Sequence, residues 1–168
     1  MTSLDINLST RIIDALAWIT TILDRLEVPY KIGGGFAAKI YGSPREVNDI
    51  DISLPGSFFD VIVPEVAEYI TAGPKHYRNE KWDCRTLSVN YKGQDIDMTD
   101  VDTLRMSNLD QSEWFKAKER RLYEAVPFVI NGVPVSLMDP RDLLAYKKEL
   151  GGEHQAIDIA AVEQYIAR

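Results

Sequence analysis

A glycine-rich turn followed by alternating carboxylates constrains this chain more than any other feature. Residues 32–54 pass through three consecutive glycines and reach an Asp-Ile-Asp sequence at Asp49 and Asp51. Glycines let backbone N–H groups approach phosphate oxygens closely. Residues at alternate positions of a strand point to the same face, so the two carboxylates can share a divalent cation. A turn suited to phosphate beside a pair of metal ligands predicts nucleotide chemistry.

Hydrophobic periodicity and turn residues predict an alternation of helices and strands. Pro64 is tolerated in a first helical turn, so the stronger part of a helix over 57–71 is expected to begin near it. The order of elements predicts an α/β (α+β) fold with a mixed β-sheet flanked by helices and with C-terminal helices. Helices are expected over residues 10–27, 36–41, 57–71, 112–121, 140–150 and 154–167. Strands are expected over residues 30–32, 49–54, 86–91, 94–99, 126–130 and 133–137.

Length, charge and cysteine content narrow the class of protein. A chain of 168 residues is expected to form one domain, with a catalytic core over about 28–100 and a C-terminal hairpin and helices over about 110–168. The lone Cys84 excludes an internal disulfide, fits a reducing compartment and is expected as a buried strand residue. Without a long apolar run or a signal-peptide pattern, the protein is expected to be cytoplasmic, with no membrane contact. The net charge of −7 argues against a broad nucleic-acid-binding surface.

The segment from the glycines to the carboxylates also resembles a known family. Its pattern is similar to the signature of the nucleotidyltransferase superfamily, which has the polymerase-β-like fold. It is most similar to the small bacterial branch that includes abortive-infection toxins and antibiotic nucleotidyltransferases. The family often has serine in place of Gly35 and threonine in place of Val47, so Gly35 offers a phosphate only its backbone. The matching residues are, in register, Gly34, Gly35, Ala37, Gly42, Pro44, Arg45, Asp49 and Asp51.

The family's third carboxylate comes from a later strand, and residues 94–98 are the obvious source. Asp95 and Asp97 share one face of this expected strand. Asp97 fits the family's hydrophobic–Asp–hydrophobic triplet better, while Asp95 has the same orientation and remains an alternative. Asp100 and Asp102 fit less well because they lie past the expected strand. The competing interpretation is an exposed acidic strand face with no catalytic role.

The resemblance implies a metal-dependent nucleotidyltransferase. Asp49, Asp51 and Asp97 would be both the catalytic residues and the ligands of Mg²⁺ or Mn²⁺, because hard cations prefer carboxylate oxygens. Two such ions favour in-line attack by an acceptor hydroxyl on the α-phosphate of a nucleoside triphosphate (NTP), with release of pyrophosphate. Gly34 and Gly35 would present backbone N–H groups to the β- and γ-phosphates.

Two basic side chains are further candidates for nucleotide binding. Arg45 lies between the glycines and the carboxylates, and it would either contact phosphate or form a salt bridge that fixes the loop. Lys147 stands in the Leu-x-x-x-Lys context of the branch and could reach the triphosphate. Asp158 resembles an acidic residue in the last helix of the branch, although residues 153–155 lack the Arg and Lys that often precede it.

The sequence does not identify the acceptor. It could be a small molecule, a protein side chain or an RNA end, and the acidic net charge leans away from RNA. One hypothesis is a toxin of a toxin–antitoxin or phage-defence pair, with an antitoxin as its partner. The alternative to an enzyme is a non-catalytic nucleotide- or partner-binding relic of the fold, which the departures at Gly35 and Val47 keep open.

Overall fold

The strands of the chain join in one mixed β-sheet with helices on two sides. A computed structural model describes residues 1–117 and 124–168. The helices are α1 (Thr10–Arg25), α2 (Gly34–Ile40), α3 (Phe59–Val66), α4 (Pro140–Lys148) and α5 (Glu153–Ile166), with the 3₁₀ helices η1 (Gly56–Phe58) and η2 (Ala67–Tyr69). The strands are β1 (Thr2–Leu4), β2 (Lys31–Ile32), β3 (Ile50–Leu54), β4 (Ile70–Arg78), β5 (Trp82–Tyr91), β6 (Gln94–Asp100), β7 (Arg105–Ser107), β8 (Trp114–Lys116), β9 (Val126–Ile130) and β10 (Val133–Leu137).

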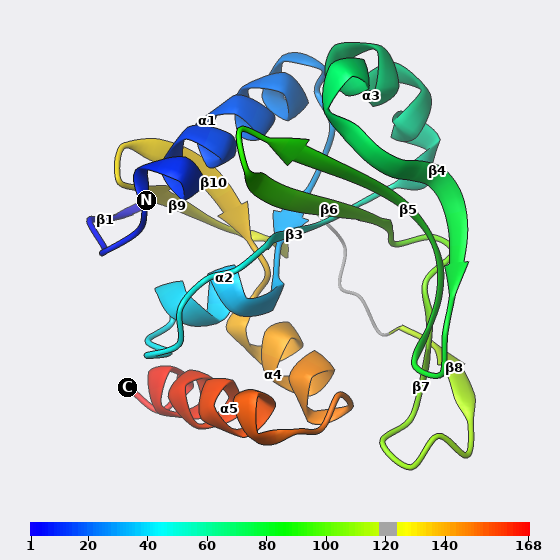
Figure 1. Cartoon of the computed structure of the whole chain (residues 1–168). Coiled ribbons are helices and arrows are strands. Elements are labelled where there is room, and N and C mark those ends of the chain that lie inside the picture. Colours follow the sequence, from blue (N-terminus) through cyan, green and yellow to red (C-terminus); the bar gives the residue numbers. More distant parts are fainter. Residues whose placement is uncertain (118–123) are drawn as a thin grey trace.

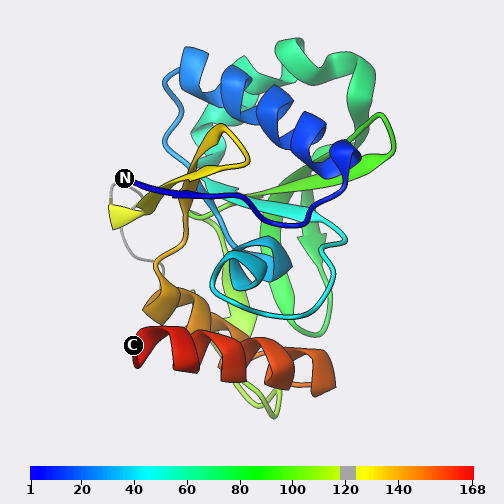
Figure 2. The same ribbon diagram turned by 90° about the vertical axis from the view of Figure 1, so that its left-hand side faces the viewer.

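The sheet has ten strands in the order β1-β9-β10-β2-β3-β6-β5-β7-β8, and β4 pairs with β5 outside this path. Three pairs are parallel, namely β1 with β9, β10 with β2, and β3 with β6. Both ribbon views show α1 and α3 above the central strands and α2, α4 and α5 below them (Figures 1 and 2). The predicted mixed sheet flanked by helices, with helices at the C-terminus, is confirmed.

Helix α1 supplies much of the core above the sheet. The Ser9 hydroxyl accepts a hydrogen bond from the backbone N–H of Ile12 at 3.2 Å and caps the first turn. Leu16, Ile19 and Leu23 follow at helical spacing and are fully buried. Burial of each such side chain contributes about 1.5–3 kcal/mol. The helix therefore holds the central strands, including those that carry the candidate carboxylates, in one fixed arrangement.

Two hairpins join strands that the sequence predicted. Lys92 and Gly93 join β5 to β6, and Asn131 and Gly132 join β9 to β10. All four residues have φ between 48° and 91°, which is the backbone conformation that two-residue hairpin turns of the primed types require. The first of these turns fixes the register between β5 and β6, and thereby decides which β5 residue faces Asp97.

The glycine turn brings the chain unusually close to Asp51. The Gly33 N–H donates to the Asp51 carbonyl oxygen at 2.9 Å, as part of the antiparallel pairing of β2 and β3. Gly34 then begins α2 with φ of 57°. A Cβ atom on Gly34 would lie 2.1 Å from Asp51 Oδ2, so only glycine fits at this position.

A second, smaller apolar cluster lies away from the main core. We refer to β4, the first half of β5, β7 and β8 as the β-arm, which Figure 1 shows descending toward the level of α4. Cys84, Leu104 and Met106 are buried in the β-arm, and Tyr146 and Leu150 from the α4 segment pack against them. This packing connects the β-arm to the C-terminal helices. It also confirms the prediction that Cys84 is a buried strand residue.

The predicted helix over 57–71 is partly wrong. Helix α3 ends at Val66, and residues 70–78 form β4, which pairs antiparallel with β5. Pro64 does not begin the helix but lies inside its second half. The burial of Phe59 and Ile62 explains the earlier start, because these side chains place one face of α3 on the core. The strand was missed because pairing with β5, rather than local sequence, determines it.

The predicted helix over 112–121 is wrong where the structure describes it. Trp114–Lys116 forms β8, which pairs antiparallel with β7, so Trp114 and Phe115 take part in a sheet. Aromatic residues fit a pleated sheet surface well, which favours the strand. The rest of this prediction, over 118–121, lies outside the described residues.

Across residues 1–117 and 124–168, no helix is both long and apolar enough to cross a membrane.

Candidate active site

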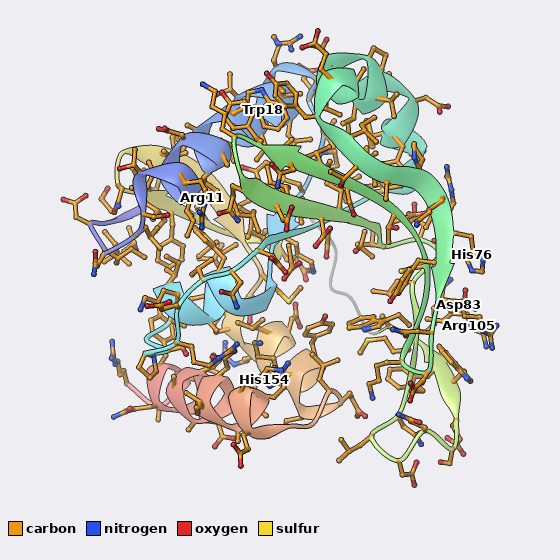
Figure 3. All side chains as sticks on the ribbon, viewed as in Figure 1. Arg11, Trp18, His76, Asp83, Arg105 and His154 are labelled. Atoms are coloured by element: carbon orange, nitrogen blue, oxygen red, sulfur yellow. The ribbon has the colours of Figure 1, made fainter. Side chains whose placement is uncertain are left out.

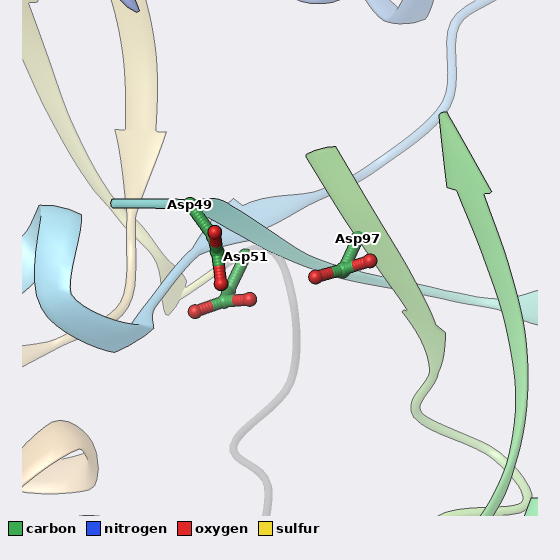
Figure 4. Close-up of side chains that lie close together, drawn as sticks. All are labelled: Asp49, Asp51 and Asp97. Atoms are coloured by element: carbon green, nitrogen blue, oxygen red, sulfur yellow. The ribbon is translucent and has the colours of Figure 1, made fainter. Parts of the chain in front are cut away.

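Three aspartates converge at one edge of the two central parallel strands. Asp49 precedes β3, while Asp51 in β3 lies directly opposite Asp97 in β6. One carboxylate oxygen from each of the three residues lies within 4.8 Å of the others (Figure 4). Asp49 is exposed, and the other two are half-buried. The structure thus brings together the three carboxylates that the sequence proposed.

The alternative third carboxylate, Asp95, lies near enough for its charge to raise the pKa of Asp49, but it makes a different contact. Its side chain accepts a hydrogen bond from Asn90 Nδ2 at 2.8 Å on an exposed part of the β5–β6 hairpin. It does not belong to the three-carboxylate group. Asp97, by contrast, is next to Asp51 because parallel pairing puts the two at the same level of the sheet. Geometry therefore favours Asp97.

Electrostatics at this edge favour a bound cation. Burial, together with the charges of Asp97 and Asp49, raises the pKa of Asp51 to about 7, although the Lys147 ammonium opposes the shift. Burial and the charges of Asp97 and Asp95 also raise the pKa of Asp49. Carboxylates that share a site repel one another until a cation or a proton compensates them. An all-carboxylate set of oxygens fits Mg²⁺ or Mn²⁺, which are hard cations.

Ser88 is a site residue that sequence reasoning missed. Its hydroxyl donates to Asp97 Oδ1 at 2.7 Å, from the strand opposite Asp97. A signal was present in the sequence, because counting back from the Lys92–Gly93 turn places Ser88 across from Asp97. The hydrogen bond fixes the orientation of the Asp97 carboxylate toward Asp51.

The carboxylates open into a cavity of about 520 Å³, a volume within the range of sites for small molecules. Gly34 and Gly35 line its wall next to Asp51, and Lys147 approaches from α4. The strand β5 forms a further wall of the cavity. The β5 residues that face it are Trp82, Cys84, Thr86 and Ser88.

Arg45 and Lys147 both bind Asp158 in helix α5. Arg45 Nη1 lies 2.5 Å from Asp158 Oδ2, and Lys147 Nζ lies 2.9 Å from the same oxygen. The Ser43 hydroxyl donates to Asp158 Oδ1 at 2.6 Å, and Lys147 Nζ also donates to Gln155 Oε1 at 2.9 Å. Arg45 thus forms the salt bridge that is one of its two predicted roles, while contact with phosphate stays a prediction.

This network joins the loop after α2 to both C-terminal helices. Burial alone would raise the pKa of Asp158, but hydrogen bonds from Ser43 and Lys147 and the charges of Lys147 and Arg45 together hold it below its ordinary value. Asp158 is fully buried, and Lys147 is only 2% exposed. Lys147 therefore pairs with Asp158 and also lines the cavity. There it lies close enough to Asp51 for its charge to lower the pKa of that carboxyl.

Asp100 has a structural role, and the prediction that it lies past the strand was wrong. It is the last residue of β6 and not a residue past the strand. Its carboxylate accepts hydrogen bonds from the Gly56 N–H at 2.7 Å and from Thr103 Oγ1 at 3.0 Å. The side chain is buried against the start of η1 and thus anchors the connection from β3 to α3.

The mixed sheet, the glycine turn and the paired strands β3 and β6 together form the nucleotidyltransferase fold. The chain is similar over 96% of its length to 97% of a candidate nucleotidyltransferase (TM1012) from Thermotoga maritima, with a TM-score of 0.62 and 17% identity. It is similar over 95% of its length to 99% of the lincosamide antibiotic adenylyltransferase LnuA with lincomycin bound, with a TM-score of 0.60 and 12% identity.

A third solved structure extends the same likeness. This structure is ANT(2″)-Ia in complex with adenylyl-2″-tobramycin. The likeness covers 94% of this chain and 90% of that protein, with a TM-score of 0.60 and 14% identity. No family model and no curated protein sequence matches the chain. The fold expected from the sequence is therefore borne out, in a set of neighbours that includes antibiotic adenylyltransferases.

Proposed function

We propose that this protein is a metal-dependent nucleotidyltransferase that moves a nucleoside monophosphate from an NTP to an acceptor hydroxyl. The observation that carries the proposal is the convergence of Asp49, Asp51 and Asp97 at the mouth of the glycine-lined cavity. The fold supports it, because the neighbours reported above are nucleotidyltransferases. In the transfer, a bond forms between the acceptor oxygen and the α-phosphorus, and the bond from that phosphorus to pyrophosphate breaks.

Each site residue has a distinct role in this proposal. Asp49, Asp51 and Asp97 would hold Mg²⁺ or Mn²⁺, which when bound polarises the phosphate and neutralises its developing charge. Asp97, oriented by Ser88, would accept the proton that leaves the acceptor hydroxyl. Gly34 and Gly35 would let the triphosphate pass close to the backbone.

The two basic residues have different places in the proposal. Lys147 would add positive charge beside the triphosphate while Asp158 holds it in place. Arg45 also lines the cavity. Its main role in this proposal is structural, because its ion pair with Asp158 fixes the loop between the glycines and the carboxylates.

The direct test uses purified protein, Mg²⁺, each of the four NTPs labelled at the α-phosphate, and a cell extract as the source of acceptors. We expect one labelled product, and we expect Asp51→Asn and Asp97→Asn to lower its rate of formation about a thousandfold, because several kcal/mol of transition-state stabilisation are lost. Circular dichroism would verify that both variants stay folded.

Asp95→Asn is the matched control, since it removes the same charge from the same strand two residues away. We expect it to keep at least about half of the wild-type rate, because Asp95 lies outside the three-carboxylate group. Full activity of Asp51→Asn and Asp97→Asn would refute the proposed site. NTP binding without transfer to any acceptor would instead favour the non-catalytic relic.

Whether the enzyme serves as a toxin in the cytoplasm depends on the identity of its acceptor. A toxin predicts growth arrest when the wild-type protein is expressed and normal growth when Asp49→Ala is expressed, and an antitoxin partner should relieve the arrest. Arrest by both proteins would separate toxicity from nucleotidyl transfer.

A further inference from the structure

The cavity extends well beyond the three carboxylates. Along β5, Ser88 marks the carboxylate end because it bonds to Asp97, while Trp82 marks the far end. The two are six positions apart, which corresponds to at most about 20 Å along an extended strand. A nucleotide whose α-phosphate lies at the carboxylates does not span that length, so the far end is available to a different group.

The far end has its own chemical character. Two of its rings, Trp82 and Tyr146, lie with their centroids 5.6 Å apart and tilted by 40°. Tyr77, which pairs with Cys84 across the strands and also lines the cavity, is 41% exposed. We call this set the aromatic end, and none of its six side chains is charged. The aromatic end comprises Tyr77, Trp82, Cys84, Leu104, Tyr146 and Leu150.

The charged residues of the β-arm face the other way. Because neighbouring residues of a strand alternate between its two faces, Asp83 points away from the cavity that Trp82 and Cys84 line. His76, Asp83 and Arg105 form a cluster of ion pairs on that outer face, at the edge of the molecule in Figure 3. The alternation concentrates apolar rings on the inner face and charge on the outer face.

We propose that the aromatic end binds the acceptor, and that the acceptor is a neutral hydroxyl compound with an apolar or aromatic ring at some distance from the reacting hydroxyl. This inference rests on the proposed nucleotidyl transfer. Aromatic side chains gain most from stacking against a flat or apolar ring. A polycationic acceptor would instead need carboxylates around its ammonium groups, and the aromatic end has none.

The test measures binding to the protein already loaded with Mg²⁺ and the non-hydrolysable α,β-methylene analogue of the NTP that the transfer assay identifies. The probes are 4-nitrophenyl glucoside and methyl glucoside, which carry the same sugar hydroxyls with and without an aromatic ring, and tobramycin as a polycation. We expect the nitrophenyl compound to bind about tenfold more tightly than the methyl compound, with tobramycin weaker than both. Trp82→Ala should abolish the difference between the glucosides and leave the affinity for the nucleotide analogue unchanged.

Two further variants keep the test independent of folding. Trp82→Phe retains a ring and should restore most of the preference for the nitrophenyl compound. Trp114→Ala removes the same side chain from β8, where it lies under Arg78 and outside the cavity lining, and should change neither affinity.

Two results would overturn the inference while leaving nucleotidyl transfer intact. The first is equal affinity for the two glucosides or tightest binding of tobramycin, with normal binding of the nucleotide analogue. The second is a loss of nucleotide affinity in Trp82→Ala, which would assign the aromatic end to the base. Failure of the wild-type protein to bind the α,β-methylene analogue of any of the four NTPs would refute the proposed function, and this inference with it.

Discussion

Asp158 and Asp51 have opposite electrostatic surroundings in this protein. Asp158 is fully buried, yet three donors compensate it, and its pKa lies below the ordinary value. Asp51 is half-buried, faces two further carboxylates, and has a pKa raised to about 7. Burial penalises both charges, so the neighbours decide the outcome. The first arrangement stabilises the fold, and the second favours binding of a cation.

Lys147 connects the two aspartates. Its ammonium binds Asp158 directly and also lowers the pKa of Asp51 through its charge. Asp158 is paired directly with Lys147, so its negative charge needs no further cation. Asp51 feels the same lysine only at a distance, so its negative charge is not fully compensated. The comparison therefore predicts that equal substitutions at the two positions have opposite effects on stability.

The largest expected effect on stability comes from Asp158→Asn. The substitution leaves Lys147 and Arg45 without their anion, and breaking a buried ion pair costs about 3–5 kcal/mol. Urea unfolding followed by circular dichroism would measure the loss of free energy of unfolding. Asp51→Asn is the matched control and should lose nothing in the absence of metal. Equal losses in the two variants would show that Asp51 is as well compensated as Asp158.

A smaller effect is expected at the point where the glycine turn approaches Asp51. In Gly34→Ala the new methyl group meets Asp51 Oδ2 and the residue must keep a φ of 57°, which together cost about 1–3 kcal/mol. Displacement of the carboxylate should also lower nucleotidyl transfer about a hundredfold. Gly35→Ala provides the control for stability, because its Cβ would meet no protein atom within 4 Å. A stable, fully active Gly34→Ala protein would contradict the proposed close approach.

The glycines and paired carboxylates were predictable from the sequence because they act over short distances along the chain. The Lys92–Gly93 turn likewise fixed the partner of Asp97 by counting alone. The β-arm was not predictable, since β4 and β8 form only by pairing with strands already in the sheet. The aromatic end depends on this pairing, so sequence reasoning identified the carboxylates but not Trp82 or Tyr146 as neighbours in one cavity.

The raised pKa of Asp51 predicts how stability depends on pH. Between pH 3.8, the ordinary pKa, and about pH 7, folded Asp51 holds a proton that the unfolded chain has released. Its contribution to the free energy of unfolding therefore falls as the pH rises through this window. In EDTA, Asp51→Asn and wild type should melt alike near pH 3.8, where this window begins, and the variant should melt a few degrees higher at pH 8.

Metal completes the pH experiment. Mg²⁺ or Mn²⁺ should raise the melting temperature of the wild-type protein at pH 8, where Asp51 is ionised, and should have little effect on Asp51→Asn. A difference between the two proteins that is constant from pH 5 to pH 8 would mean that Asp51 has an ordinary pKa. Asp158→Asn should show no comparable response to metal, because its partners are fixed side chains.

The smallest effect is expected at Ser88, which orients Asp97 without touching Asp51. Removing one hydrogen bond in Ser88→Ala costs about 0.5–1.5 kcal/mol, so the turnover rate should fall roughly three- to tenfold with little change in the KM for NTP. Asn90→Ala removes the equivalent hydrogen bond from Asp95, two residues along both strands, and should leave the rate unchanged. If the two variants behave alike, the orientation of Asp97 has no part in the reaction, and the carboxylate acts by its charge alone.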